Sequence, residues 1–163
     1  MKISAAKWPR FNNMITHNDF EEFLRLLNAT GAKYVIIGGY AVAFHGHIRS
    51  TGDLDIFFGR SAENITAVMR ALRQFGFSES VVDRELFEAE DNIIRIGVPP
   101  IRIELMSNIS GVSFSDVWES RVEGRYGDVE TAFISLSDLI TNKRASARPK
   151  DMLDADQLES DEN

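Results

Sequence analysis

Cysteine is absent from the 163-residue chain, which excludes a disulfide framework and a thiolate metal site. No apolar run approaches the roughly 20 residues of a membrane-spanning helix, and the first residues lack the apolar core of a signal peptide. We therefore expect a cytoplasmic protein with no membrane partner. Positively charged residues are also few, since the chain has 18 Lys and Arg residues but 25 Asp and Glu residues. The net charge of −7 argues against wrapping nucleic acid on a broad basic surface, but not against a local patch that holds an RNA end.

What remains is the composition of one globular domain. Hydrophobic residues make up 44% of the chain and charged residues 26%, which is typical of a domain long enough to bury a core. We expect a single domain over 1–163, with a frayed acidic tail over 159–163 and an extended arm around Trp8-Pro9.

The spacing of apolar residues predicts an α/β (α+β) fold, a mixed sheet of about five strands flanked by helices. Alternating or β-branched runs predict strands over 34–37, 53–58, 92–97, 101–106 and 129–136. Helical spacing predicts helices over 20–27, 40–44, 61–75, 113–122, 139–147 and 150–158. We expect Asn18 or Asp19 to cap the first helix, and Ser137-Asp138 to cap the fifth.

The most informative stretch is 34–58, YVIIGGYAVAFHGHIRSTGDLDIFF, in which a buried strand is followed by a short helix and a second strand. Residues two apart on a strand share a face, so Asp53 and Asp55 stand side by side while Leu54 and Ile56 face the core. Two adjacent carboxylates repel each other, and a divalent cation such as Mg²⁺ is their simplest partner. The alternative is a solvated strand end with two ordinary carboxylates.

The glycine pair Gly38-Gly39 breaks the first of these strands. Glycines let the backbone approach a phosphate closely, so this bend and the aspartate pair together have the layout of a phosphoryl-transfer site. A plain tight turn is the alternative. No Walker lysine and no GxGxxG fingerprint follow the glycines, and Phe57 stands where an EF-hand needs an oxygen ligand.

Gly38-Gly39 followed by Asp53-x-Asp55 resembles the signature of the DNA polymerase β-type nucleotidyltransferase superfamily. The longer pattern GGYAVAFHG…RSTGDLD resembles its minimal bacterial branch, which includes the AbiEii-type abortive-infection toxins. The resemblance implies a polymerase β-like fold and metal-dependent transfer of a nucleoside monophosphate from an NTP to a hydroxyl acceptor. It further implies Mg²⁺ or Mn²⁺ as cofactor, bound by catalytic carboxylates that include Asp53 and Asp55.

The superfamily keeps a third acidic residue in the middle of a later strand, and Glu104 stands at such a position here. On the strand over 101–106, Arg102 and Glu104 share one face. We therefore take Glu104 as the third catalytic and metal-binding carboxylate, and as a candidate general base. The superfamily usually has aspartate at this position.

Residues 143–154, KRASARPKDMLD, resemble the C-terminal motif K-x4-R-x-K-D-x2-D of AbiEii-like nucleotidyltransferases. By position the resemblance implies that Lys143 binds the NTP phosphates and that Asp151 lies near the site, with Arg148 and Lys150 in support. A solvated helix end is the alternative, since cations complement the helix dipole there. Two further nucleotide-binding candidates are Arg49 and Thr51, which immediately precede the aspartate pair. His45 and His47 either border the pocket or cap the short helix.

The acceptor stays open: a tRNA or other RNA end, a protein, or a small molecule such as an aminoglycoside or lincosamide. The overall acidity favours a cationic small molecule. A partner protein is a further candidate, because the chain has little beyond a catalytic core. The alternatives to an enzyme are a non-catalytic nucleotide-binding or toxin–antitoxin partner module with the same fold, and a structural domain without a ligand.

Overall fold

The computed structural model describes residues 16–162. The arm expected around Trp8-Pro9 and the last residue, Asn163, lie outside this range. No helix within the described range is long and apolar enough to cross a membrane.

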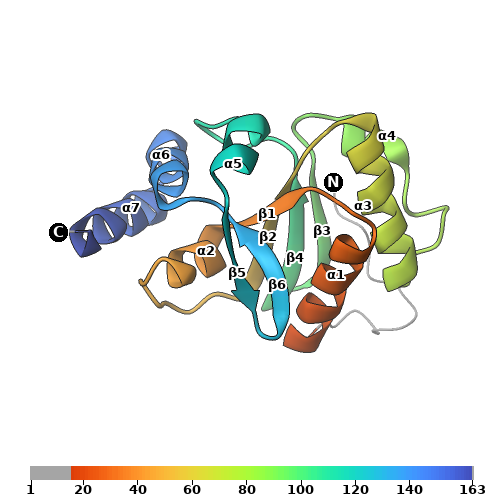
Figure 1. Cartoon of the computed structure of the whole chain (residues 1–163), viewed down its shortest axis with the longest axis horizontal. Coiled ribbons are helices and arrows are strands. Elements are labelled where there is room, and N and C mark those ends of the chain that lie inside the picture. The colour runs from red at the N-terminus through yellow and green to blue at the C-terminus, as the bar shows by residue number, and fades with distance from the viewer. Residues whose placement is uncertain (1–15, 163) are drawn as a thin grey trace.

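A six-stranded mixed sheet, in the order β3-β4-β2-β1-β6-β5, forms the middle of the molecule (Figure 1). Neighbouring strands are antiparallel except for the parallel pairs β1–β6 and β2–β4. The strands are β1 (Tyr34–Ile37), β2 (Asp53–Phe58), β3 (Ile93–Val98), β4 (Ile101–Met106), β5 (Val122–Tyr126) and β6 (Val129–Phe133).

The edge strand β5 was not predicted, because 113–122 was assigned to a helix and the next strand was placed at 129–136. Its sequence, VEGRY, is mostly exposed and gives almost no apolar alternation from which a strand can be recognised. The expectation of about five strands was therefore one short.

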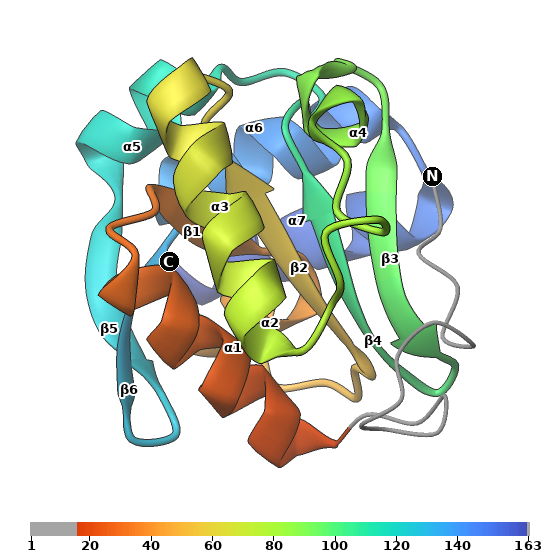
Figure 2. The ribbon, with the colours of Figure 1, turned by 90° about the vertical axis from the view of Figure 1, so that its right-hand side faces the viewer.

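Helices cover both faces of this sheet. On one face α1 and α3 lie side by side in front of the strands (Figure 2), and on the other side lie α2, α6 and α7 (Figure 1). The helices are α1 (His17–Ala29), α2 (Gly38–Phe44), α3 (Ala62–Phe75), α4 (Arg84–Glu88), α5 (Phe114–Ser120), α6 (Leu136–Ser146) and α7 (Pro149–Asp161).

The alternation in β2 divides its side chains between these two layers. Leu54 and Ile56 are fully buried in the main core together with Phe23 of α1 and Leu72 of α3. Burial of each such side chain contributes about 1.5–3 kcal/mol to folding. This core fixes β2 in place, so that the intervening aspartates are presented on the opposite face of the sheet.

Three helix ends differ from the sequence prediction. Thr16, not Asn18 or Asp19, caps α1, and Asp19 closes the capping box by accepting a hydrogen bond from the Thr16 backbone N–H at 2.6 Å. Ser135 caps α6, which begins at Leu136 rather than at 139. The tail that was expected to fray from 159 is helical to Asp161. Packing of α7 against α6 stabilises this last turn, a tertiary contact that sequence periodicity does not reveal.

Candidate active site

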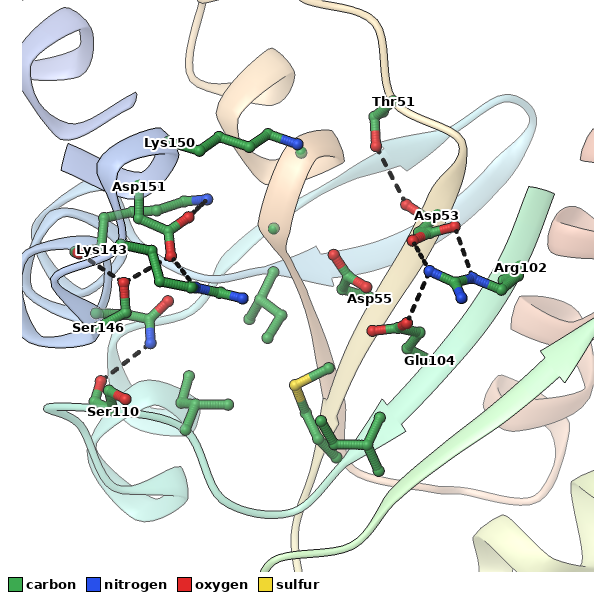
Figure 3. A pocket seen from close by; sticks show the side chains of 18 of the residues that line it. Thr51, Asp53, Asp55, Arg102, Glu104, Ser110, Lys143, Ser146, Lys150 and Asp151 are labelled. Carbon is green, nitrogen blue, oxygen red and sulfur yellow. Dashed lines mark hydrogen bonds and ion pairs between the residues drawn. The ribbon is translucent and has the colours of Figure 1, made fainter. Parts of the chain in front are cut away.

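A cavity of about 550 Å³ lies between the sheet and the helices α2, α6 and α7 (Figure 3). A volume of this size is in the range of small-ligand sites. Its lining includes eleven residues that the sequence proposed for the site, from five separate segments: Gly38, Gly39, Arg49, Thr51, Asp53, Asp55, Glu104, Lys143, Arg148, Lys150 and Asp151.

The glycine bend forms one side of the cavity and has no room for side chains. Gly38 has a φ of +66°, which favours glycine, and a Cβ there would collide with the carboxylate of Asp55. A Cβ at Gly39 would lie 2.6 Å from the hydroxyl oxygen of Thr51. The bend thus brings the backbone directly against the residues that begin β2.

The three predicted carboxylates share one face because of strand register. In the parallel pair β2–β4, Asp53 lies opposite Arg102 and Asp55 lies opposite Glu104. On the far side of β4, Arg95 of β3 lies opposite Glu104. We call Asp53, Asp55, Arg95, Arg102 and Glu104 the sheet wall of the cavity.

Two arginines of the sheet wall neutralise two of its carboxylates. The guanidinium of Arg102 donates to both carboxylate oxygens of Asp53, at 3.3 and 2.9 Å, and its Nη2 lies 3.4 Å from Oε1 of Glu104. Nε of Arg95 donates to the same Oε1 at 3.1 Å. The bond to Asp53 is the main cause of a raised pKa of Arg102. The sequence predicted that Arg102 and Glu104 share a face, but it assigned no role to Arg95 or Arg102. Their carboxylate partners depend on the register between strands, which the sequence does not reveal.

Asp55 differs from its neighbours, because its carboxylate makes no hydrogen bond or ion pair with any residue within 16–162. Burial raises the pKa of Asp55 to about 7, and the charges of Glu104 and Asp53 act in the same direction. The charges of Lys143 and Arg102 oppose this rise without cancelling it. A carboxylate in this position is stabilised only by a proton or by a further cation.

The donor chemistry of the sheet wall fits a divalent cation, since carboxylate oxygens are the ligands of Mg²⁺ and Asp55 lacks a counter-ion. As the side chains stand, however, no group of three or more His, Asp or Glu residues in the described part of the chain is arranged to hold a metal ion. In this structure Arg102 pairs with Asp53 and with Oε1 of Glu104, and Arg95 pairs with the same oxygen of Glu104.

On the other side of Asp55 lie Lys143, Ser146, Lys150 and Asp151 (Figure 3). Together with Arg148, which donates a hydrogen bond to Asp151, they form the helical wall. Its centre is Lys143, which is only 5% exposed, so it is not part of a solvated helix end. Nζ of Lys143 donates to Asp151 and to Asp154, each at 3.0 Å. The sequence did not give a role to Asp154, although it is the last aspartate of the C-terminal motif.

Both buried aspartates of this network have further partners. Asp151 accepts hydrogen bonds from Ser146 at 2.6 Å and from Arg148 at 2.8 Å. Burial by itself raises the pKa of Asp151, but the bonds from Ser146, Lys143 and Arg148 more than offset it, so the pKa lies below its usual value. Asp154 accepts two hydrogen bonds from Arg49, each at 3.0 Å.

The remaining candidates have structural contacts. Thr51 donates to the backbone carbonyl of Asp53 at 3.4 Å, at the entry to β2. His45 lies outside the cavity lining, and its Nε2 is 2.8 Å from the carbonyl oxygen of Ile134. His47 does not line the cavity either.

Comparison with known proteins identifies a family and a fold. The model of a family described as nucleotidyltransferase of unknown function (DUF6036) matches residues 17–159. A crystal structure of the lincosamide antibiotic adenylyltransferase LnuA, lincomycin-bound, is similar with a TM-score of 0.57 and 16% identity, over 91% of this chain and 99% of that one. No curated protein matches. At this identity the structural likeness shows a shared fold.

Proposed function

The chain belongs to the DUF6036 nucleotidyltransferase family and has the fold implied by the resemblance, and we propose that it transfers a nucleoside monophosphate from an NTP to an acceptor hydroxyl with a divalent metal ion. Family membership supports nucleotidyl transfer in general. Metal-dependent transfer at the sheet wall is supported by the carboxylate of Asp55, which is unpaired within residues 16–162. This carboxylate lies beside Glu104 and against the glycine bend.

In this proposal the NTP phosphates lie between the glycine bend and the helical wall. Gly38 and Gly39 both line the cavity, and because neither has a Cβ their backbone lies directly against Asp55 and Thr51. Lys143 uses two of its three N–H donors on aspartates, which leaves one for a phosphate oxygen. Arg148 and Lys150 line the same wall and add positive charge near the distal phosphates.

Asp53, Asp55 and Glu104 would hold Mg²⁺ or Mn²⁺ on the sheet wall. When bound, such an ion activates the acceptor oxygen and stabilises the leaving pyrophosphate. The chain's own contribution is positional. Rigid strands β2 and β4 hold the carboxylates side by side, and the pairing of Arg102 with two of them limits their mutual repulsion until the ion binds.

The transfer step forms one bond and breaks one. The acceptor oxygen attacks the α-phosphorus, and the bond from this phosphorus to the bridging oxygen of the β-phosphate breaks, so pyrophosphate leaves with the electron pair. The acceptor proton passes to Glu104 and then to solvent. Both arginine contacts of Glu104 are made through Oε1, which leaves Oε2 to accept this proton.

The test is incorporation of label from each α-³²P-labelled NTP, with Mg²⁺ or Mn²⁺, into RNA, protein and aminoglycoside acceptors. We expect transfer by the wild-type protein and by Asp128→Asn, an exposed turn residue, and none by Asp55→Ala. Absence of transfer under every combination, with nucleotide binding intact by calorimetry, would instead support the non-catalytic nucleotide-binding or partner module.

A further inference from the structure

Basic residues are concentrated in the cavity of an otherwise acidic protein. Of the 18 Lys and Arg residues in the chain, six line this cavity, together with four acidic residues. The cavity therefore has an excess of two positive charges in a chain whose net charge is −7. The six are Arg49, Arg95, Arg102, Lys143, Arg148 and Lys150. Such a local excess attracts anionic ligands.

These basic residues form two groups on opposite sides of Asp55. Lys143 and Lys150 lie on the side of the helical wall, whereas Arg102 lies with Asp53 and Glu104 on the other side (Figure 3). Arg95 continues this second group on β3, one strand farther from the glycine bend. Under the proposed function, the NTP triphosphate accounts for the first group. It does not account for Arg95 and Arg102, which lie on the side of Glu104, the residue assigned to the acceptor.

The two arginines have donors to spare. Arg102 uses Nε and Nη2, and Arg95 uses Nε alone, so Nη1 of Arg102 and both terminal nitrogens of Arg95 make no hydrogen bond within residues 16–162. Their side chains are 26% and 39% exposed, on the cavity. Neutralising Asp53 and Glu104 does not require these remaining N–H donors, which face the cavity without a partner among residues 16–162. A guanidinium fork matches the oxygens of a phosphate.

We propose that the acceptor carries a phosphate group close to its reacting hydroxyl, and that Arg95 and Arg102 bind this phosphate. The proposal rests on the proposed function, because it assigns the acceptor of the same transfer step. It reverses the expectation drawn from overall acidity, since two guanidinium groups beside the reacting carboxylate repel an aminoglycoside-like cation. The phosphate comes either from the last linkage of an RNA end or from a phosphorylated small molecule.

Acceptor binding is tested without turnover, by fluorescence anisotropy of a 5′-labelled single-stranded hexaribonucleotide with a free 3′ hydroxyl. A matched oligonucleotide has a neutral methylphosphonate in its last linkage. We expect the neutral linkage and Arg95→Met each to weaken binding by about 10-fold, with little further loss when the two are combined. Arg95→Lys should bind the charged oligonucleotide more tightly than Arg95→Met does. Arg60 is exposed and lies outside the cavity, so Arg60→Met is the control and should leave the affinity unchanged.

Label transfer separates the two sources of phosphate. Transfer to the oligonucleotide identifies an RNA end, whereas transfer to ribose 5-phosphate but not to ribose or the oligonucleotide identifies a small phosphorylated acceptor. Either result supports the proposal if Arg95→Met raises the acceptor KM about 10-fold and leaves NTP affinity within about twofold.

Efficient transfer to kanamycin with no response to Arg95→Met would overturn the proposal and leave the proposed function standing. Equal affinity for the charged and neutral oligonucleotides, in a protein that transfers label to ribose as well as to ribose 5-phosphate, would overturn it too. Failure of transfer to every acceptor, with normal NTP binding, counts against the proposed function itself.

Discussion

The helical wall and the sheet wall contain similar residue types but balance their charges differently. In the network of the helical wall, Asp151 and Asp154 each accept hydrogen bonds from at least two positively charged or hydroxyl groups, and Lys143 lies between them. In the sheet wall, two arginines neutralise Asp53 and Glu104. The carboxylate of Asp55 has no hydrogen-bond or ion-pair partner within residues 16–162.

This difference shows which wall is complete without a ligand. Buried charges are tolerated when each has a partner, and the helical wall satisfies that condition with the chain's own groups. The sheet wall does not, because three carboxylates share a face with two guanidinium groups. Unfavourable electrostatics of this kind is retained at sites where a ligand supplies the missing charge. Four changes test the comparison.

The largest expected effect is on catalysis at the sheet wall. Asp55→Asn removes the unpaired charge and keeps the shape, and we expect it to lower the rate of nucleotide transfer by about 10³-fold, or about 4 kcal/mol in activation free energy. Initial rates with saturating NTP measure this loss. A rate within about tenfold of wild type would show that Asp55 is not part of the reacting centre.

The next effect is on stability at the helical wall. Asp154→Ala leaves Lys143 and Arg49 without a shared carboxylate, and we expect a loss of about 3 kcal/mol in the free energy of unfolding. Urea denaturation measures it. Asp156→Ala, two residues along α7 at an exposed ion pair, is the matched control and should leave the urea midpoint unchanged. Equal midpoints for the two variants would mean that the buried network does not stabilise the fold.

The two walls should also titrate with opposite signs. The raised pKa of Asp55, about 7 in the folded protein, means that its contribution to stability is full below about pH 4 and is lost as the pH rises to 7. Asp55→Asn should therefore stabilise the protein at pH 8 by about 2 kcal/mol and much less at pH 4.

Asp151 has a lowered pKa, so its contribution is present above its unfolded pKa and is lost as the pH falls. Asp151→Asn should consequently destabilise the protein at pH 8, and this destabilisation should become smaller as the pH falls below 4. Urea denaturation of both variants across this pH range measures the two slopes. Slopes of the same sign would contradict the contrast between the walls.

The smallest effect concerns the glycine bend. Gly38→Ala introduces both a positive-φ alanine and a collision with the carboxylate of Asp55, whereas Gly31→Ala, at φ +75°, introduces the backbone strain alone because nothing lies within 4 Å. We expect each substitution to cost about 1 kcal/mol for the backbone, with a further loss of about 1 kcal/mol at Gly38. Thermal unfolding of both measures the difference. Combination with Asp55→Ala removes the carboxylate and leaves only the Cβ contact at 3.1 Å, so it should remove most of the extra loss. If the whole extra loss persisted, the collision would not involve this carboxylate.

The sequence predicted those features that depend on local pattern. The runs that became β1, β2 and β4 are apolar or alternating, and the position of Asp53 and Asp55 on one face follows from strand geometry alone. The pairing of Arg102 with Asp53 depends on the register of two strands far apart in the chain, which no local pattern encodes. The edge strand β5 lacks the alternation of apolar and polar residues from which a strand is predicted.

The helical wall was the hardest part to predict. A run with four basic residues in ten is typical of a solvated helix end, yet Lys143 is buried because α7 folds back and supplies Asp151 and Asp154. The resemblance to a known motif placed Lys143 near the site. It did not predict that aspartates would surround its ammonium group, since that arrangement is a property of the helix pair and not of either helix.

The bond between Arg49 and Asp154 joins residues 105 positions apart in the chain. The loop before β2 is thus anchored by a helix that is synthesised near the end of the described chain. Asp154 also accepts a hydrogen bond from Lys143, so this loop, α6 and α7 share one buried network. Loosening of α7 would therefore also release the loop that leads into the aspartate pair, so a disturbance at one end of the described chain reaches the opposite side of the cavity.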